Sequence, residues 1–318
     1  MPVSEVMTVT GPMPASELGV VDAHDHLFLH TPALPGDEFE DLERSTAEAV
    51  DGRESGIGTI VDLTPIGLGR RPDLLRAVSE ATGLAIIGAT GYHRDAHYPA
   101  GHWVHDATVD ELAHRLARDL ADGMHPTDWD DPAVAPDAAK AGVIKVGTSY
   151  HHASDSERRR LEAAAVESRR GGVAIVVHAE VGTFGHQIVD ILTGHGVAAG
   201  RIVLAHMDRN PDPELHAEIA ARGAYLEYDT IGRTKYRPDS EILDLIESVA
   251  SAGHLDRLML GLDLGRRLML RAYGGGPGLG YLMRTFVPRL RRRIGADAVD
   301  AILVTNPARA FALAEPLA

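Results

Sequence analysis

A lysine at the end of an apolar segment is the first residue in this chain that suggests chemistry. Lys145 closes the run Ala141-Gly-Val-Ile-Lys145, and only three of the 31 lysine and arginine residues are lysines. A buried ammonium is energetically costly unless it is paired. That cost disappears if the neutral amine reacts with CO₂, because the resulting carbamate is an anion whose two oxygens can bridge two metal ions. We therefore interpret Lys145 as a candidate carboxylated bridge.

Metal-ligating residue types recur at the ends of other apolar segments. His24 and His26 are two residues apart, and alternate residues of a strand point the same way, so both can reach one ion. His178, His206 and Asp263 end three later segments. Imidazole nitrogens suit Zn, Fe, Co, Ni or Mn. With the carbamate, these residues can hold two divalent ions, bridged by the carbamate and by a hydroxide. Zn²⁺ is the expected ion, and Co, Mn, Ni and Fe are also compatible.

Each of these residues has a structural explanation when it is taken alone. His178 or His206 could be a hydrogen-bonded core histidine, Asp263 could cap the following loop, and Lys145 could form a buried ion pair. A single His-x-His pair is also common in strands. The joint pattern favours the metal site, because six ligand-capable residues fall at the ends of five predicted strands.

The elements that must position these residues alternate regularly along the chain. The sequence contains eight near-continuous apolar runs, as expected for parallel strands covered on both faces. These runs are Gly19–Leu29, Thr59–Thr64, Ala85–Gly91, Gly142–Val146, Val173–Ala179, Arg201–Met207, Ala224–Tyr228 and Leu258–Leu264. Predicted helices are Phe39–Ser55, Arg71–Ala81, Val109–Ala121, Ser154–Arg170, Gly185–Thr193, Pro213–Arg222, Ser240–Ala252, Leu279–Arg293 and Ala296–Leu313. Ser154 and Glu157 fit a capping box, and Gly123–Pro136 reads as a long loop. This alternation predicts an α/β fold, a single (β/α)₈ barrel domain over residues 1–318, with the candidate ligands at the carboxyl ends of its strands.

Composition narrows the classes of function. The chain is 44% hydrophobic and 24% charged, with a net charge of −15, which argues against a nucleic-acid or anionic-membrane partner. It has no cysteine, so disulfides and cysteine-based zinc sites are excluded. Neither a signal peptide in residues 1–18 nor a membrane-spanning run is evident. We expect a cytoplasmic protein with a small-molecule substrate, and a homodimer is compatible with the sequence.

Five segments in a specific order resemble the phosphotriesterase-related family of the amidohydrolase superfamily. They are Val21–His26, Ala141–Gly147, Val177–Ala179, Leu204–Asp208 and Leu260–Asp263. The resemblance implies that His24, His26 and Asp263 hold the more buried metal ion, that His178 and His206 hold the more exposed one, and that carboxylated Lys145 bridges them. It also implies that Asp263 is the catalytic acid–base group.

A narrower resemblance concerns the substrate. Segments Gly232–Tyr236, Arg266–Arg267 and Ala272–Gly278 are similar to the branch of the family that hydrolyses lactones of phosphorylated sugars. In that branch a lysine and an arginine grip the phosphate, and they map to Lys235 and Arg266. Related sequences tend to carry a tyrosine where this chain has Met269, which implies weaker binding of the phosphate, a different sugar or a substrate without phosphate.

Further residues on the predicted loops are candidate substrate contacts. Arg233 adds positive charge beside Lys235, and Tyr92 and His93 follow the third predicted strand, where a sugar ring could be contacted. Loop packing explains Tyr92 and His93 equally well. The predicted reaction is opening of a lactone ring by a metal-bridging hydroxide. An organophosphate triesterase, a lactonase for non-phosphorylated substrates and a catalytically silent metal-binding sensor remain as alternatives.

Overall fold

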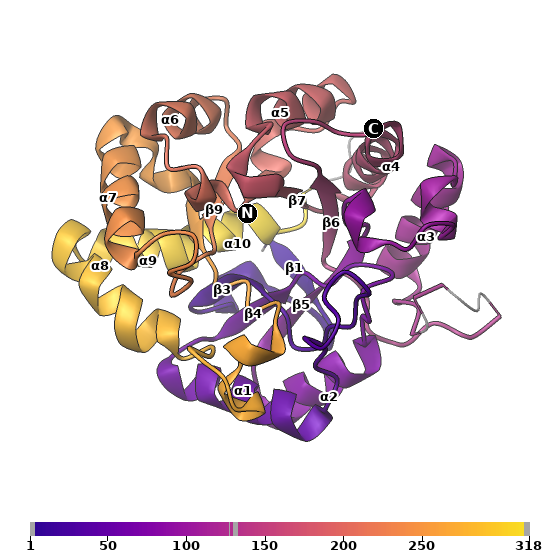
Figure 1. The fold of residues 1–318 in the computed structure, drawn as a ribbon, viewed down its shortest axis with the longest axis horizontal. Coiled ribbons are helices and arrows are strands. Elements are labelled where there is room, and N and C mark those ends of the chain that lie inside the picture. The colour runs from indigo at the N-terminus through magenta and orange to yellow at the C-terminus, as the bar shows by residue number, and fades with distance from the viewer. Residues whose placement is uncertain (1–3, 127, 130–132, 315–318) are drawn as a thin grey trace.

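Eight parallel strands form the barrel that the sequence predicts. The structure is a computed structural model that describes residues 4–126, 128–129 and 133–314. The strands pair in chain order (Figure 1): β3 Val21–Asp25, β4 Thr59–Asp62, β5 Ala85–Gly91, β6 Val143–Thr148, β7 Ile175–Ala179, β8 Ile202–Ala205, β9 Tyr225–Tyr228 and β10 Leu258–Leu260. The barrel closes just beyond β10, where the amides of Leu262 and Asp263 donate to the carbonyl of His24 at 3.1 and 2.9 Å. The predicted (β/α)₈ barrel is confirmed.

Helices surround the barrel in a ring (Figure 1). They are α1 Leu42–Ser55, α2 Pro72–Thr82, α3 Val109–Ala121, α4 Asp155–Gly171, α5 Gly185–Gly194, α6 Pro213–Ala221, α7 Asp239–Val249, α8 Val287–Ile294, α9 Ala296–Asp300 and α10 Asn306–Phe311. The predicted capping box is present, with the Ser154 hydroxyl accepting from the Glu157 amide. The last two predicted helices are interrupted by π-helical turns at Leu282–Phe286 and Ala301–Thr305. In the predicted loop 123–136, residues 127 and 130–132 lie outside the described residues.

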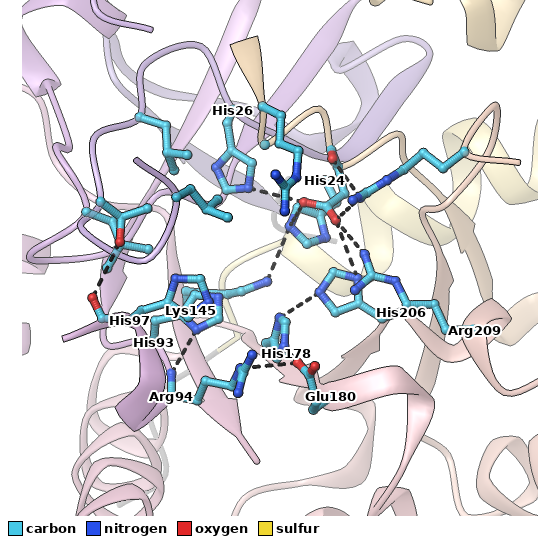
Figure 2. Close-up of a pocket in the computed structure, with 18 of the residues that line it drawn as sticks. His24, His26, His93, Arg94, His97, Lys145, His178, Glu180, His206 and Arg209 are labelled. Atoms are coloured by element: carbon cyan, nitrogen blue, oxygen red, sulfur yellow. Dashed lines mark hydrogen bonds and ion pairs between the residues drawn. The ribbon is translucent and has the colours of Figure 1, made fainter. Parts of the chain in front are cut away.

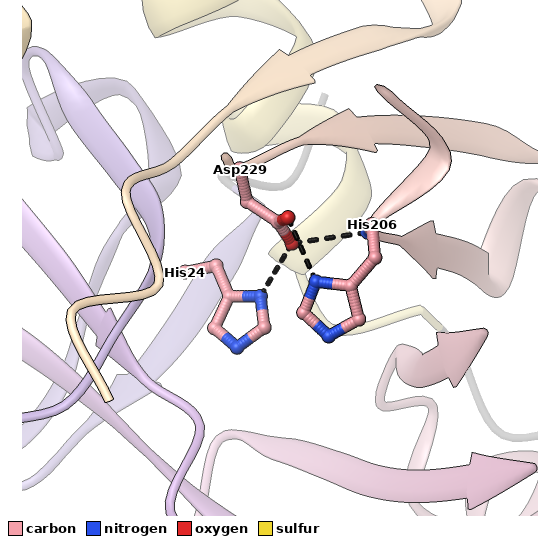
Figure 3. Close-up of side chains that lie close together, drawn as sticks. All are labelled: His24, His206 and Asp229. Carbon is pink, nitrogen blue, oxygen red and sulfur yellow. Dashed lines mark hydrogen bonds and ion pairs between the residues drawn. The ribbon is translucent and has the colours of Figure 1, made fainter. Parts of the chain in front are cut away.

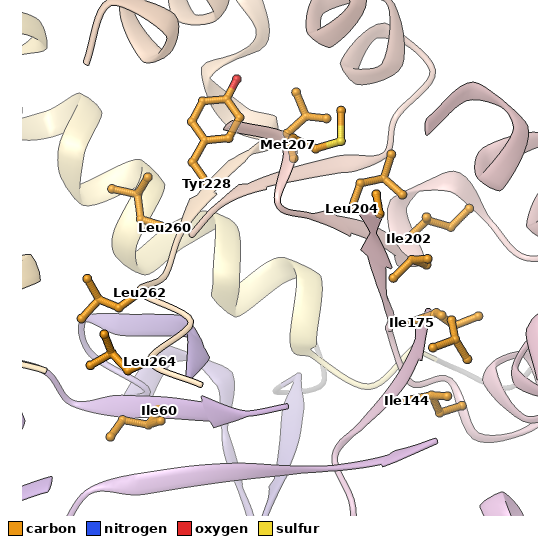
Figure 4. Close-up of a cluster of buried hydrophobic side chains, with 14 of the residues drawn as sticks. Ile60, Ile144, Ile175, Ile202, Leu204, Met207, Tyr228, Leu260, Leu262 and Leu264 are labelled. Atoms are coloured by element: carbon orange, nitrogen blue, oxygen red, sulfur yellow. The ribbon is translucent and has the colours of Figure 1, made fainter. Parts of the chain in front are cut away.

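Apolar side chains fill two layers because successive residues of each strand point to opposite faces. In β4, Ile60 belongs to the cluster between barrel and helices, whereas Val61 belongs to the cluster inside the barrel. Figure 4 shows part of the outer cluster, which Ile144, Ile175 and Leu204 extend along neighbouring strands. Burial on both faces explains why these strands read as continuous apolar runs in the sequence.

An antiparallel hairpin that the sequence analysis does not predict covers the other end of the barrel. Its strands are β1 Glu5–Thr8 and β2 Gly11–Pro14. The amide of Val9 donates to the carbonyl of Ile86 at 2.9 Å, and the amide of Leu313 donates to the carbonyl of Glu5 at 2.7 Å. No helix in the described part of the chain combines the length and hydropathy needed to cross a lipid bilayer.

Four strands end earlier than predicted, and for two of them the reason bears on the site. β3, β4, β8 and β10 were predicted to extend to Leu29, Thr64, Met207 and Leu264. His206 and Asp263 adopt φ angles of 65° and 48°, in the left-handed region that ends a strand and that residues other than glycine rarely occupy. Such strain is characteristic of functional positions, and both residues are candidate metal ligands.

The barrel seam beside His24 depends on a glycine. A Cβ added to Gly261 would lie 2.8 Å from the backbone nitrogen of His24. This distance is too short, and relieving it requires one of the two backbone segments to move. We predict that Gly261→Ala lowers the free energy of unfolding by about 1–3 kcal/mol, measured as a shift in the urea midpoint. Gly200→Ala is the control, since its Cβ would meet nothing within 4 Å. Equal midpoints for the two variants would contradict this account of the seam.

Candidate metal centre

The six predicted ligands line one cavity at the carboxyl ends of the strands (Figure 2). The cavity is lined by His24, His26, Lys145, His178, His206 and Asp263. His24, Lys145 and His178 lie within β3, β6 and β7, and the other three follow the ends of β3, β8 and β10. The parallel sheet therefore brings together residues that are up to 239 positions apart in the sequence.

One group of ligand atoms lies around the first strand. The Nε2 atoms of His24 and His26 are 3.7 and 3.4 Å from Oδ1 of Asp263. These three residues offer ligand atoms that all lie within 4.8 Å of one another. The Nζ atom of Lys145 is 3.4 Å from Nε2 of His24. The lysine amine thus borders this group of ligand atoms.

A second group is formed by His178 and His206, whose Nδ1 and Nε2 atoms face each other at 2.8 Å. The other ring nitrogen of each is hydrogen-bonded to a carboxylate: His178 Nε2 donates to Glu180 at 2.6 Å and His206 Nδ1 donates to Asp229 at 2.8 Å. A neutral imidazole carries only one N–H, so the two facing nitrogens both present lone pairs. Two lone pairs at this separation need a cation between or beside them. This donor arrangement fits a metal ion.

Buried partners fix the other two imidazoles in the same way. Asp229 accepts from Nδ1 of His24 at 2.8 Å through Oδ2, while its Oδ1 accepts from His206, so one carboxylate joins both groups of ligands (Figure 3). Nδ1 of His26 donates to the hydroxyl of Thr64 at 2.8 Å, and that hydroxyl donates onward to the carbonyl of Phe28. Outer partners of this kind set the tautomer and leave Nε2 free to bind a metal.

Burial shifts the pKa values of Lys145 and His178 in the direction that metal binding needs, whereas His24 shifts the other way. Burial lowers the pKa of Lys145, which favours the neutral amine that reacts with CO₂. It also lowers the pKa of His178 to about 4. His24 differs: burial and the Lys145 ammonium lower its pKa, but hydrogen bonds to Asp229 and Glu227 outweigh them and raise it to about 9. Its acidic surroundings therefore favour a cation at this ring, and a metal ion can replace the proton.

A glycine sets the position of Lys145. Gly91 has a φ of +117°, and a Cβ at this position would lie 1.8 Å from the carbonyl oxygen of Lys145. That oxygen accepts a hydrogen bond of 2.7 Å from the amide of Tyr92. Only a residue without a side chain allows β5 to approach β6 this closely, and the approach fixes the strand end from which the lysine projects.

Two arginines contact Oδ2 of the Asp263 carboxylate. Arg209 donates to Oδ2 at 2.6 Å, and Arg233 contacts the same oxygen and donates to the Asp263 carbonyl at 2.9 Å. Burial alone would raise the pKa of Asp263, but the Arg233 guanidinium and contact with the His26 imidazole hold it well below its usual value. The carboxylate therefore stays ionised, with Oδ1 toward the histidines and Oδ2 toward the arginines.

The predicted substrate contacts divide into two groups. Arg233, Arg266 and His93 line the cavity. Tyr92 does not: it is fully buried and its hydroxyl donates to the carbonyl of Leu112 at 2.9 Å, on the helix side of the barrel. Lys235 is exposed and also lies outside the cavity lining, with its ammonium 5.7 Å from the centroid of the Tyr236 ring.

Three residues of the site escaped sequence reasoning. Asp229 directly follows β9, so the rule of polar residues at strand ends would have found it. Glu180 is two residues beyond His178, and Arg209 is three beyond His206. Neither has a local signal, because their roles depend on turns that bring them back to the histidines.

Comparisons with known proteins agree with this geometry. The sequence model of the phosphotriesterase family matches residues 4–311 of this chain. A phospho-furanose lactonase of Mycoplasmopsis agalactiae is 33% identical over 325 residues, which cover 98% of this chain and 92% of that protein. A lactonase structure from Listeria monocytogenes superposes with a TM-score of 0.90 at 27% identity and covers 98% and 100% of the two chains. The phosphotriesterase homology protein of Escherichia coli, in a structure with phosphate in its active site, superposes with a TM-score of 0.84 at 29% identity. The match covers 93% of this chain and 99% of that chain.

Fold and comparisons together define a hydrolase that acts on ester bonds, built on a (β/α)₈ barrel. The chain belongs to the phosphotriesterase family, a family of metal-dependent hydrolases with a binuclear centre. The resemblance inferred from the sequence is thereby confirmed.

Metal ions should stabilise the fold, because the facing lone pairs of His178 and His206 are unfavourable without a cation. A ligand that binds only the folded state at 100 times its dissociation constant adds about 2.7 kcal/mol. We predict that chelator-treated protein gains at least this much on addition of Zn²⁺, measured by urea unfolding. His206→Asn should gain less. A metal-independent urea midpoint in the unmodified protein would contradict the fit of this site to metal ions.

Proposed function

We propose that the protein hydrolyses lactones, and that its preferred substrates are lactones of phosphorylated sugars. The observation that carries this proposal is the charge of the cavity wall. Arg94, Arg209, Arg233 and Arg266 all line the cavity, although the chain as a whole has a net charge of −15. Local positive charge of this kind attracts an anionic substrate that the rest of the surface repels. The relatives named as lactonases support the same reaction class.

The proposed cofactor is a pair of divalent ions, Zn²⁺ by preference. His24, His26 and Asp263 would hold the more buried ion, His178 and His206 the more exposed one, and Lys145 would bridge them as its carbamate. Lys145→Ala should then lose both metal and activity. When bound, two such ions lower the pKa of water and polarise a carbonyl group.

Asp263 would move the proton in this reaction. Its carboxylate accepts a proton from the attacking water and passes it to the ring oxygen that leaves as the lactone opens. Arg209 and Arg233 hold Oδ2 at one position, so the carboxylate does not have to reorganise during the transfer. His93 can orient the sugar ring, since its Nδ1 accepts from the Arg94 amide at 2.8 Å and its Nε2–H is available to a substrate oxygen.

The phosphate would be bound away from the reacting bond, so that its binding energy orients the ring. Arg266 is the cation best placed for this role, because it lines the cavity while its side chain stays 42% exposed and pairs with Asp37 at 2.6 Å. A phosphate can displace that carboxylate. Lys235 would have to leave the face of Tyr236 to join it.

Three alternatives use the same residues. An organophosphate triesterase would favour a neutral substrate and apolar walls, which the four cavity arginines oppose. A lactonase for non-phosphorylated substrates would not need Arg266. A silent metal-binding sensor would turn over nothing. A pH-indicator screen of phosphorylated and free aldonolactones, with paraoxon-type triesters and added metal, separates these: turnover of a phosphorylated lactone supports the proposal, and a preference for neutral esters overturns it.

Replacing Asp263 tests the proton transfer. We predict that Asp263→Asn lowers kcat by about 10²–10⁴-fold and raises KM much less, because general acid–base help is lost while substrate contacts remain. Metal content must be measured in parallel, since the residue is also a proposed ligand. Asp190→Asn is the control, because that exposed carboxylate pairs with Arg222 on the outer surface. A kcat within threefold of wild type in Asp263→Asn would rule out the role.

Removing the proposed phosphate contacts tests the substrate. A hydrogen bond to a charged group contributes about 1.5–3 kcal/mol, so Arg266→Met or Lys235→Met should lower kcat/KM for a phosphorylated lactone by roughly 10- to 150-fold. The corresponding free lactone should be hydrolysed at nearly the wild-type rate. Equal losses of kcat/KM on both substrates would show that these side chains do not bind the phosphate.

A further inference from the structure

The four imidazoles of the site each have an outer hydrogen-bond partner, and one of these partners is unlike the rest. Asp229 and Thr64, which serve His24, His206 and His26, are fully buried. Glu180, which serves His178, lines the cavity itself, and its side chain is 22% exposed. It is therefore the outer partner that a substrate or solvent can reach.

The position of Glu180 depends on a strained turn. Directly after β7 the chain bends through Glu180–Gly182, where Val181 adopts φ 55° and ψ 32°. Branching at Cβ makes this left-handed conformation rare for valine. The hydroxyl of Thr183 donates to the Glu180 carbonyl at 2.7 Å and holds the turn closed. The turn returns the carboxylate of Glu180 to the side chain of His178, two residues earlier.

A cation from another strand loop holds the carboxylate from its other side. Arg94, which follows β5, places Nε 3.1 Å from Oε2 of Glu180, the same oxygen that accepts from His178 Nε2 at 2.6 Å (Figure 2). The result is a chain of contacts from Arg94 through Glu180 to His178. Elsewhere an exposed pair, His186 on α5 and Glu218 on α6, has a similar contact of 3.0 Å, and neither residue lines the cavity.

We propose that Glu180, held by Arg94, is a positioning residue for the more exposed metal ion. It keeps the proton of His178 on Nε2 and the ring in one orientation, so that Nδ1 faces the site. This inference rests on the proposed two-ion centre. Loss of an outer-shell partner typically weakens metal binding by 10–100-fold. Because the other ion is served by Asp229 and Thr64, the effect should be confined to the exposed ion.

The test is a two-step metal titration. Metal-free full-length protein is equilibrated with Zn²⁺ buffered at a series of free concentrations, with bicarbonate present, and bound metal is counted by mass spectrometry. Glu180→Met should weaken the second binding step by about 10–100-fold and leave the first unchanged. Arg94→Met should shift the same step in the same direction by less. Glu218→Met is the matched control and should leave both steps as in wild type.

The conservative variant separates positioning from direct ligation. Glu180→Gln keeps an acceptor for His178 Nε2 but has no charge, so it should recover most of the lost affinity, and the Co²⁺ absorption spectrum should stay that of wild type. A second step within threefold of wild type in Glu180→Met would overturn the inference, as would equal losses in Gln and Met variants or equal shifts of both steps. If the wild-type protein itself binds fewer than two ions, the proposed function fails instead.

Discussion

The carboxylate of Asp229 is the contact on which the site depends. It accepts from His24 through one oxygen and from His206 through the other, and so it joins the first strand of the barrel to the sixth. Both bonds point the free Nε2 atoms toward the cavity. Because the carboxylate is fully buried, losing either imidazole would remove a hydrogen-bond donor from a buried charge, which is costly in a medium of low dielectric constant. That one constraint fixes the positions of His24 and His206 across the barrel.

The charged groups of the cavity fall into two regions. Around the histidines the buried groups are mainly acidic, and they favour a cation even when no metal is considered, as the raised pKa of His24 indicates. Nearer the mouth the cavity is lined by Arg94 and Arg266, each paired with a carboxylate. This arrangement suits a reaction in which the reacting carbonyl meets cations at depth while an anionic group of the substrate stays near the mouth.

Much of the fold and the ligand set could be predicted because both are encoded locally. Apolar runs define the strands, and ligand-capable residues at or near the ends of five of them line the shared cavity, so His178 or Lys145 could be found without knowing its neighbours. The hydrogen-bond partners of the ligands could not be predicted in this way. His24 and Asp229 are 205 residues apart, and they meet because the barrel closes. Tyr92 shows the limit of strand-end reasoning, because neighbouring residues face opposite sides and it is His93 that lines the cavity. Lys235 lies on a loop whose conformation no periodicity specifies.

The most direct test of the two-ion centre is to detect the carbamate itself. Metal-free protein is mixed with two equivalents of Zn²⁺ and ¹³C-labelled bicarbonate, and the ¹³C NMR spectrum is compared with that of Lys145→Met treated in the same way. We expect one protein-bound carbamate signal in the wild-type protein, formed in proportion to bound metal and absent from the variant. Two fully bound Zn²⁺ ions without any such signal would contradict the account.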